Sequence, residues 1–94
     1  MKLQDIKTIQ DFIAFCKEVL ATKPEYMSEE EHEQPATAVF SACLLDSIEE
    51  LYDIYPELVE ISDISSNLEW SNSFNTSEDW RKIRVLLERL EKKI

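Results

Sequence analysis

The sequence predicts an all-α fold: a small bundle of three main helices plus one or two short helices, forming a single domain over residues 1–94. The chain contains no glycine, so it lacks the residue that most readily adopts positive φ and that tight hairpin turns prefer. Its three prolines, Pro24, Pro35 and Pro56, fall where helices are expected to begin or end. Elsewhere apolar residues recur at steps of three and four, the spacing of a helix face. A hydrophobic share of 44% indicates a packed core despite the net charge of −10.

The first helix is predicted over residues 8–22. Thr8 is a favourable N-cap, and Asp11 places an acid in the first turn, where the helix dipole stabilises it. Pro24 ends the region. One apolar stripe runs along this helix and comprises Ile9, Phe12, Ile13, Cys16, Val19 and Leu20.

The stretch "SEEEHEQ" (28–34) contains the chain's only histidine, His32, among four glutamates. Ser28 followed by Glu31 is a capping-box pattern, and glutamates suit the positive end of a helix dipole. We therefore interpret this stretch as helix initiation plus a negative field. We expect His32 on a solvated turn without a structural partner, so that its removal has almost no effect.

A second, longer helix is predicted over residues 36–55, between Pro35 and Pro56. Its expected buried face comprises Phe40, Cys43, Leu44, Ile48, Leu51 and Tyr55.

Residues 56–75 carry the weakest pattern. Leu58, Ile61, Ile64 and Leu68 follow at steps of three, three and four, after which Ser and Asn accumulate. We predict a short helix and then an ordered loop whose aromatics, Trp70 and Phe74, fill the core.

The last helix is predicted over residues 77–93. Thr76 or Ser77 is its N-cap, acids occupy its first turn and lysines its last, which matches the dipole at both ends. Glu78 and Lys82 form a supporting pair four residues apart, and Val85 is expected to be exposed. The expected buried stripe comprises Trp80, Ile83, Leu86, Leu87, Leu90 and Ile94.

Charge is distributed unevenly along the chain. All ten Lys and Arg lie in residues 1–23 or 81–94, whereas residues 24–80 contain fifteen Asp and Glu and no basic residue. Such a field attracts a basic partner and accelerates association. The predicted partner-binding residues are acids on the outer face of the second helix, opposite its apolar face, and Glu57 joins them if the helix direction persists past Pro56. They are Asp46, Glu49, Glu50, Asp53 and Glu57.

Several kinds of chemistry find no support in the sequence. One histidine and two distant cysteines, Cys16 and Cys43, do not form a standard zinc pattern, and we expect no cofactor. Both cysteines lie on apolar stripes, where a thiol is usually inert, so no catalytic nucleophile is indicated. The net charge disfavours direct contact with nucleic acid. The sequence contains no run of about 18 apolar residues, so no membrane span is predicted. Neither a secretory leader nor a disulfide framework is indicated, so we expect a cytoplasmic protein.

These observations favour a non-enzymatic interaction or regulatory module, such as an inhibitor, immunity or adaptor protein, which docks a basic protein surface through its acidic helix face. Two alternatives remain open. The chain could self-assemble, with its basic C-terminal helix against the acidic field of a second copy. It could also be a metal-binding protein or enzyme that uses the Glu/His cluster, which the residue pattern favours least.

Overall fold

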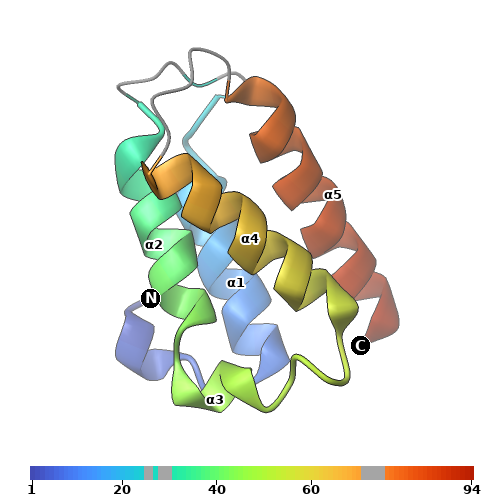
Figure 1. The fold of residues 1–94 in the computed structure, drawn as a ribbon. Coiled ribbons are helices and arrows are strands. Elements are labelled where there is room, and N and C mark those ends of the chain that lie inside the picture. The colour runs from blue at the N-terminus through green and yellow to red at the C-terminus, as the bar shows by residue number, and fades with distance from the viewer. Residues whose placement is uncertain (25–26, 28–30, 71–75) are drawn as a thin grey trace.

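The computed structural model describes residues 1–24, 27, 31–70 and 76–94. These residues form one 3₁₀ turn and five α-helices and contain no strand, which confirms the all-α prediction (Figure 1). The elements are η1 (Leu3–Asp5), α1 (Ile9–Leu20), α2 (Glu33–Cys43), α3 (Asp46–Glu49), α4 (Pro56–Trp70) and α5 (Ser77–Lys93).

Helix α1 begins as the sequence predicts. The Thr8 hydroxyl accepts a hydrogen bond from the Asp11 N–H, and the Asp11 carboxylate accepts one from the Thr8 N–H, each at 3.2 Å. This reciprocal capping satisfies two backbone donors that the helix cannot satisfy itself. A further N–H from Lys7 donates to the same carboxylate and is the main cause of the lowered pKa of Asp11.

The predicted helix over residues 36–55 is wrong in its extent. Helix α2 ends at Cys43, Leu45 is extended, and only the short α3 follows before a series of turns. The break carries Ile48 into the core but leaves Leu44 63% exposed, although Leu44 was expected to be buried. The Tyr52 hydroxyl donates to the Cys43 carbonyl at 2.5 Å and so satisfies a backbone acceptor in the last turn of α2.

Helix α4 is a fourth main helix rather than the predicted short one. Its apolar residues at Leu58, Ile61 and Leu68 are buried, as the spacing indicates. Trp70, however, is 78% exposed, so its predicted role as a core residue is wrong. Phe74 lies outside the described residues.

Helix α5 matches its prediction closely. Trp80, Ile83, Leu86, Leu87 and Leu90 are buried, Val85 is exposed, and Lys82 lies 3.9 Å from Glu78. Two details differ: Ile94 is 47% exposed, and Thr76 occupies the N-cap position without a capping hydrogen bond. The buried Thr76 hydroxyl instead donates to the Met27 carbonyl at 2.7 Å, which links the start of α5 to a distant loop residue.

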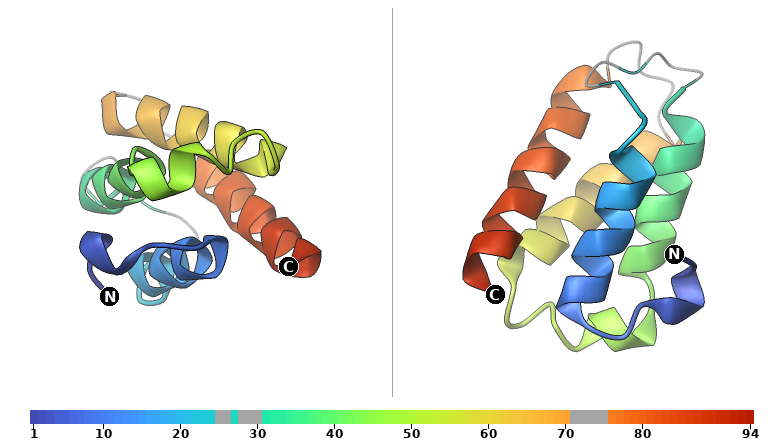
Figure 2. Two further views of the ribbon diagram at one scale, coloured as in Figure 1. Left: turned by 90° about the horizontal axis from the view of Figure 1, so that it is seen from below. Right: turned by 180° about the vertical axis from the view of Figure 1, so that it is seen from behind.

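The four longer helices enclose one core. Helix α2 packs against both α1 and α4, and α5 closes the ring by packing against α4 and α1 (Figures 1 and 2). Helix α3 lies across one end of this ring, next to the C-terminal end of α2. Residues 44–55 therefore run along one end of the bundle, where Ile48 enters the core and the charged side chains remain exposed.

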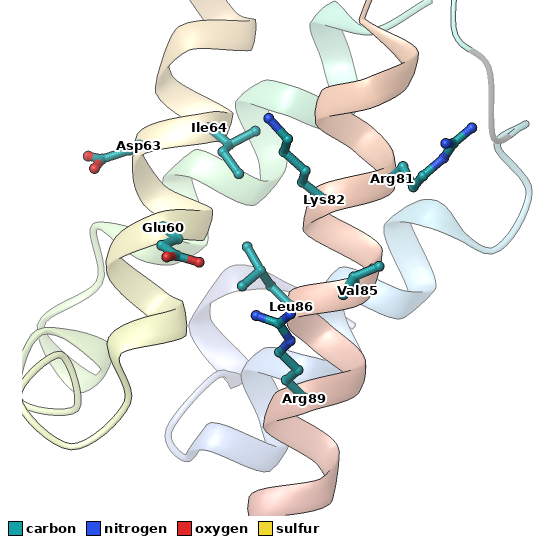
Figure 3. Close-up of a pocket in the computed structure, with 8 residues that line it drawn as sticks. All are labelled: Glu60, Asp63, Ile64, Arg81, Lys82, Val85, Leu86 and Arg89. Atoms are coloured by element: carbon teal, nitrogen blue, oxygen red, sulfur yellow. The ribbon is translucent and has the colours of Figure 1, made fainter.

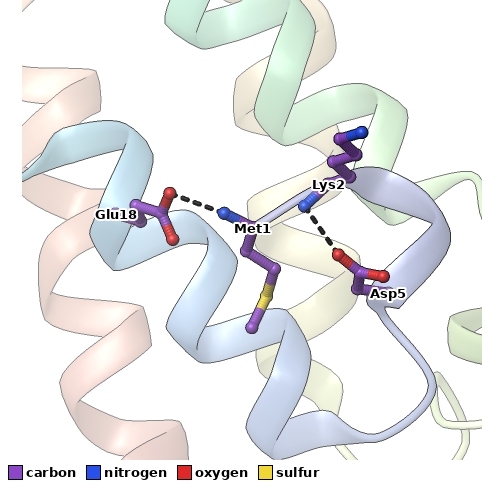
Figure 4. A network of polar contacts seen from close by, with 4 residues as sticks. All are labelled: Met1, Lys2, Asp5 and Glu18. Carbon is purple, nitrogen blue, oxygen red and sulfur yellow. Dashed lines mark hydrogen bonds and ion pairs between the residues drawn. The ribbon is translucent and has the colours of Figure 1, made fainter.

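The N-terminal residues are fixed to the same bundle. The Met1 ammonium group lies 2.7 Å from the Glu18 carboxylate on α1, and the Lys2 N–H donates to Asp5 at 3.1 Å (Figure 4). The Ser47 hydroxyl of α3 donates to the Ile6 carbonyl at 2.9 Å. These contacts connect the first residues to both α1 and α3.

Both cysteines are unpaired and buried, as their positions on apolar stripes predict. Burial raises the pKa of the Cys43 thiol to about 12 and raises the pKa of Cys16 well above its ordinary value. Because the thiolate is the nucleophile, neither side chain is suited to attack a substrate.

Candidate functional site

Four of the five predicted partner-binding acids lie on one exposed segment. Asp46 and Glu49 belong to α3, Glu50 follows it directly, and Asp53 lies in the turns beyond; all four are exposed. We call these four residues the acidic edge. They do not form the single helix face that the sequence suggested, because the chain is not helical from Glu50 to Tyr55.

Glu57, the fifth predicted residue, is placed differently. It lies in the first turn of α4, is only 7% exposed, and its carboxylate oxygens lie 2.6 and 2.9 Å from the Lys93 ammonium group. The contact with Lys93 is the main cause of the lowered pKa of Glu57. Glu57 therefore joins the start of α4 to the end of α5 and is occupied by that contact.

This ion pair predicts a pH dependence of stability. Since the pKa of Glu57 is lower in the folded chain than its ordinary value of 4.5, the pair stabilises the fold above that value and is lost as the pH falls below it. We expect Glu57→Gln to lower the urea midpoint at pH 7 and to make it less sensitive to acid. Equal midpoint differences between wild type and Glu57→Gln at pH 7 and pH 3 would contradict this role.

Two large apolar side chains lie at the ends of the segment that carries the acidic edge. Leu44 is 63% exposed and Ile54 is 62% exposed. Exposed apolar groups surrounded by charge are typical of contact surfaces, where the apolar groups supply the desolvated centre. Neither exposure is predicted by the sequence, whose spacing places Leu44 on the buried face and gives Ile54 no role. The neighbouring Leu44 and Leu45 gave no warning, because two consecutive helix residues can both be buried, as Leu86 and Leu87 are.

His32 is not the solvated residue that we expected. It is 3% exposed, and its Nε2 lies 2.8 Å from the Leu68 carbonyl. Since a carbonyl only accepts, Nε2 must carry the proton in this contact. Leu68 is among the last four residues of α4, whose carbonyls have no partner within the helix. His32 therefore caps the C-terminal end of α4 from the start of α2.

No metal site is found in the described part of the chain. Across residues 1–24, 27, 31–70 and 76–94, no three His, Cys, Asp or Glu side chains lie close enough together to hold a metal ion. The predicted N-cap Ser28, and Glu29 and Glu30 of the same stretch, lie outside these residues. None of the described helices is long and apolar enough to cross a membrane.

A groove of about 420 Å³ lies between α4 and α5 (Figure 3). Its apolar part is formed by Ile64 of α4 and by Val85 and Leu86 of α5. Val85 is 41% exposed, whereas Leu86 is buried, so the groove rises from the core to the surface.

The two walls of this groove carry opposite charges. Helix α4 contributes acids and α5 contributes bases, and Figure 3 shows Glu60 and Arg89 directed toward one another while Asp63 and Arg81 point outward on opposite sides. The charged residues of the walls are Glu60 and Asp63 on α4, and Arg81, Lys82 and Arg89 on α5.

Comparison with known proteins adds no further assignment. No family model matches the chain, and no curated protein or solved structure is significantly similar to it. The function must therefore be inferred from the acidic edge and the groove.

Proposed function

We propose that this protein is a non-enzymatic binding module that docks a basic protein surface through its acidic edge. The observation that carries the proposal is the set of exposed side chains in segment 44–54, where four exposed acids lie between two exposed apolar residues, Leu44 and Ile54. Residues 24–80 contain no Lys or Arg, so no basic residue close in the sequence neutralises these acids.

The two kinds of side chain have separate roles in this mechanism. The acids attract a positively charged partner over several ångströms and raise the association rate, an effect that salt screens. Leu44 and Ile54 lose their exposed apolar surface on contact, which slows dissociation. Glu57 belongs to the predicted set but contributes to stability rather than to docking, because Lys93 already pairs with it.

The buried, unpaired thiols of Cys16 and Cys43 support a reducing compartment, and we propose that the module acts in the cytoplasm. Nothing in this mechanism requires a cofactor.

Two charge-matched variants test the acidic edge. Glu49→Lys/Glu50→Lys reverses two acids of the edge, and Glu33→Lys/Glu88→Lys reverses two exposed glutamates on α2 and α5. Each variant is immobilised alongside the wild type, and proteins retained from the native lysate are quantified at low and high salt. We expect at least one basic protein to be retained by the wild type and by the Glu33/Glu88 variant, lost from the Glu49/Glu50 variant, and released by salt.

A third variant, Leu44→Ser/Ile54→Ser, separates the apolar contribution from the charge contribution. It should still capture the same protein at low salt but should release it faster in a surface-binding assay. Equal retention by the Glu49/Glu50 and Glu33/Glu88 variants would contradict the proposal, since retention would then follow net charge alone.

A further inference from the structure

The α4–α5 groove is distinct from the acidic edge and has an arrangement of its own. An apolar floor lies between an acidic wall, with Glu60 and Asp63, and a basic wall, with Lys82 and Arg89 (Figure 3). The walls belong to two neighbouring helices that run in opposite directions. Because the acids lie on α4 and the bases on α5, the two charges form adjacent stripes along the groove.

This order of charges is complementary to itself. If a second copy faces the groove, related by a twofold axis that lies along it, the acidic α4 of each copy meets the basic α5 of the other. A twofold axis across the groove would instead bring acid against acid. Isologous contacts of the first kind are the usual basis of homodimers.

We propose that the α4–α5 face is the interface of a twofold-symmetric homodimer. The charge of this face favours a second copy as its occupant. The chain as a whole carries −10, yet the groove walls hold three basic and two acidic side chains. Two copies can therefore meet at this face without the repulsion that the net charge of −10 would cause between two acidic surfaces. Val85, the exposed apolar residue among the basic ones on α5, supplies a contact that loses its water in the dimer.

Charge exchange between the two helices tests the interface. The basic variant Glu60→Lys/Asp63→Lys places base against base in a dimer, and the acidic variant Lys82→Glu/Arg89→Glu places acid against acid. Like charges brought together at an interface oppose association strongly. We expect each variant alone to have a dimer dissociation constant at least about tenfold above that of the wild type in sedimentation equilibrium.

Two restorations make the test specific. A mixture of the basic and acidic variants should form a one-to-one heterodimer, because each wall then meets its opposite. A chain with all four substitutions keeps the net charge of the wild type and should dimerise as the wild type does. Circular dichroism of each variant establishes that it is folded before its association is measured.

Several results would overturn the proposal: a wild type that stays monomeric at all concentrations, a mixture that does not associate, or a four-substitution chain that remains monomeric. Self-association of the basic variant would also overturn it, by indicating that the acidic edge contacts α5 head to tail. If the wild type is monomeric and the groove variants no longer bind another protein that the wild type binds, the face is the binding site for that protein instead. The proposed docking by the acidic edge uses other residues, so its test succeeds or fails separately.

Discussion

Trp80→Ala should destabilise the protein by about 3–5 kcal/mol, the range for truncating a buried aromatic side chain. Trp80 is 0% exposed and packs in the core that α5 shares with α1 and α4. Small domains are stable by about 5–15 kcal/mol in total, so this single change should remove a large share of the stability. Urea unfolding followed by far-UV circular dichroism measures the loss without relying on tryptophan emission.

The chain supplies a matched control, because its other tryptophan is exposed. Trp70 is 78% exposed, so Trp70→Ala should change the stability by no more than about 0.5 kcal/mol. Trp80→Phe should cost less than Trp80→Ala, since the Trp80 indole N–H has no acceptor among the described residues and most of the ring volume is retained. Equal destabilisation by the two alanine variants would show that the core is assigned wrongly.

His32→Ala should have the second-largest effect, although the sequence alone predicted almost none. Removing the ring leaves the buried Leu68 carbonyl without its donor at the end of α4, which costs about 1–3 kcal/mol, and the cavity adds to this loss. The urea midpoint at neutral pH should fall accordingly.

His32→Gln is the informative companion to His32→Ala, because a glutamine amide can still donate to the Leu68 carbonyl. It should restore part of the stability that His32→Ala removes. An alanine variant within about 0.5 kcal/mol of the wild type would refute the cap and return His32 to the role of a surface residue.

Sequence patterns were sufficient for the helices whose signals are local. In α1 the N-cap Thr8, the acid at Asp11 and the apolar stripe all agree, and the observed helix follows them. In α5 the acids of the first turn, the lysines of the last turn and the apolar spacing agree in the same way. Where every local preference supports one structure, tertiary contacts have little to override.

The break between α2 and α3 could not be predicted from local preferences. Residues 36–55 contain neither glycine nor an internal proline, so nothing marks Leu44 and Leu45 as an end. A continuous helix would place like charges four residues apart at Asp46 and Glu50, and again at Glu49 and Asp53, each pair costing about 0.2–0.5 kcal/mol. Contacts made only after the chain turns, such as Tyr52 with the Cys43 carbonyl, further stabilise the broken form.

Burial of polar side chains was equally hidden. Nothing near His32 in the sequence indicates that Leu68, 36 positions away, supplies its partner. The same holds for Glu57, whose partner Lys93 also lies 36 positions away. The exposed acids of the candidate site were predictable from composition, whereas the apolar residues beside them and the groove between α4 and α5 required the packed helices.

The backbone of the described residues never adopts positive φ. Each of these residues therefore has a conformation that alanine can also adopt without steric cost. An alanine scan of this protein would measure side-chain contacts with little interference from backbone strain, apart from the three prolines, whose replacement also frees φ. The scan would distinguish buried core residues from interface residues, because substitutions of the former change folding and substitutions of the latter change association.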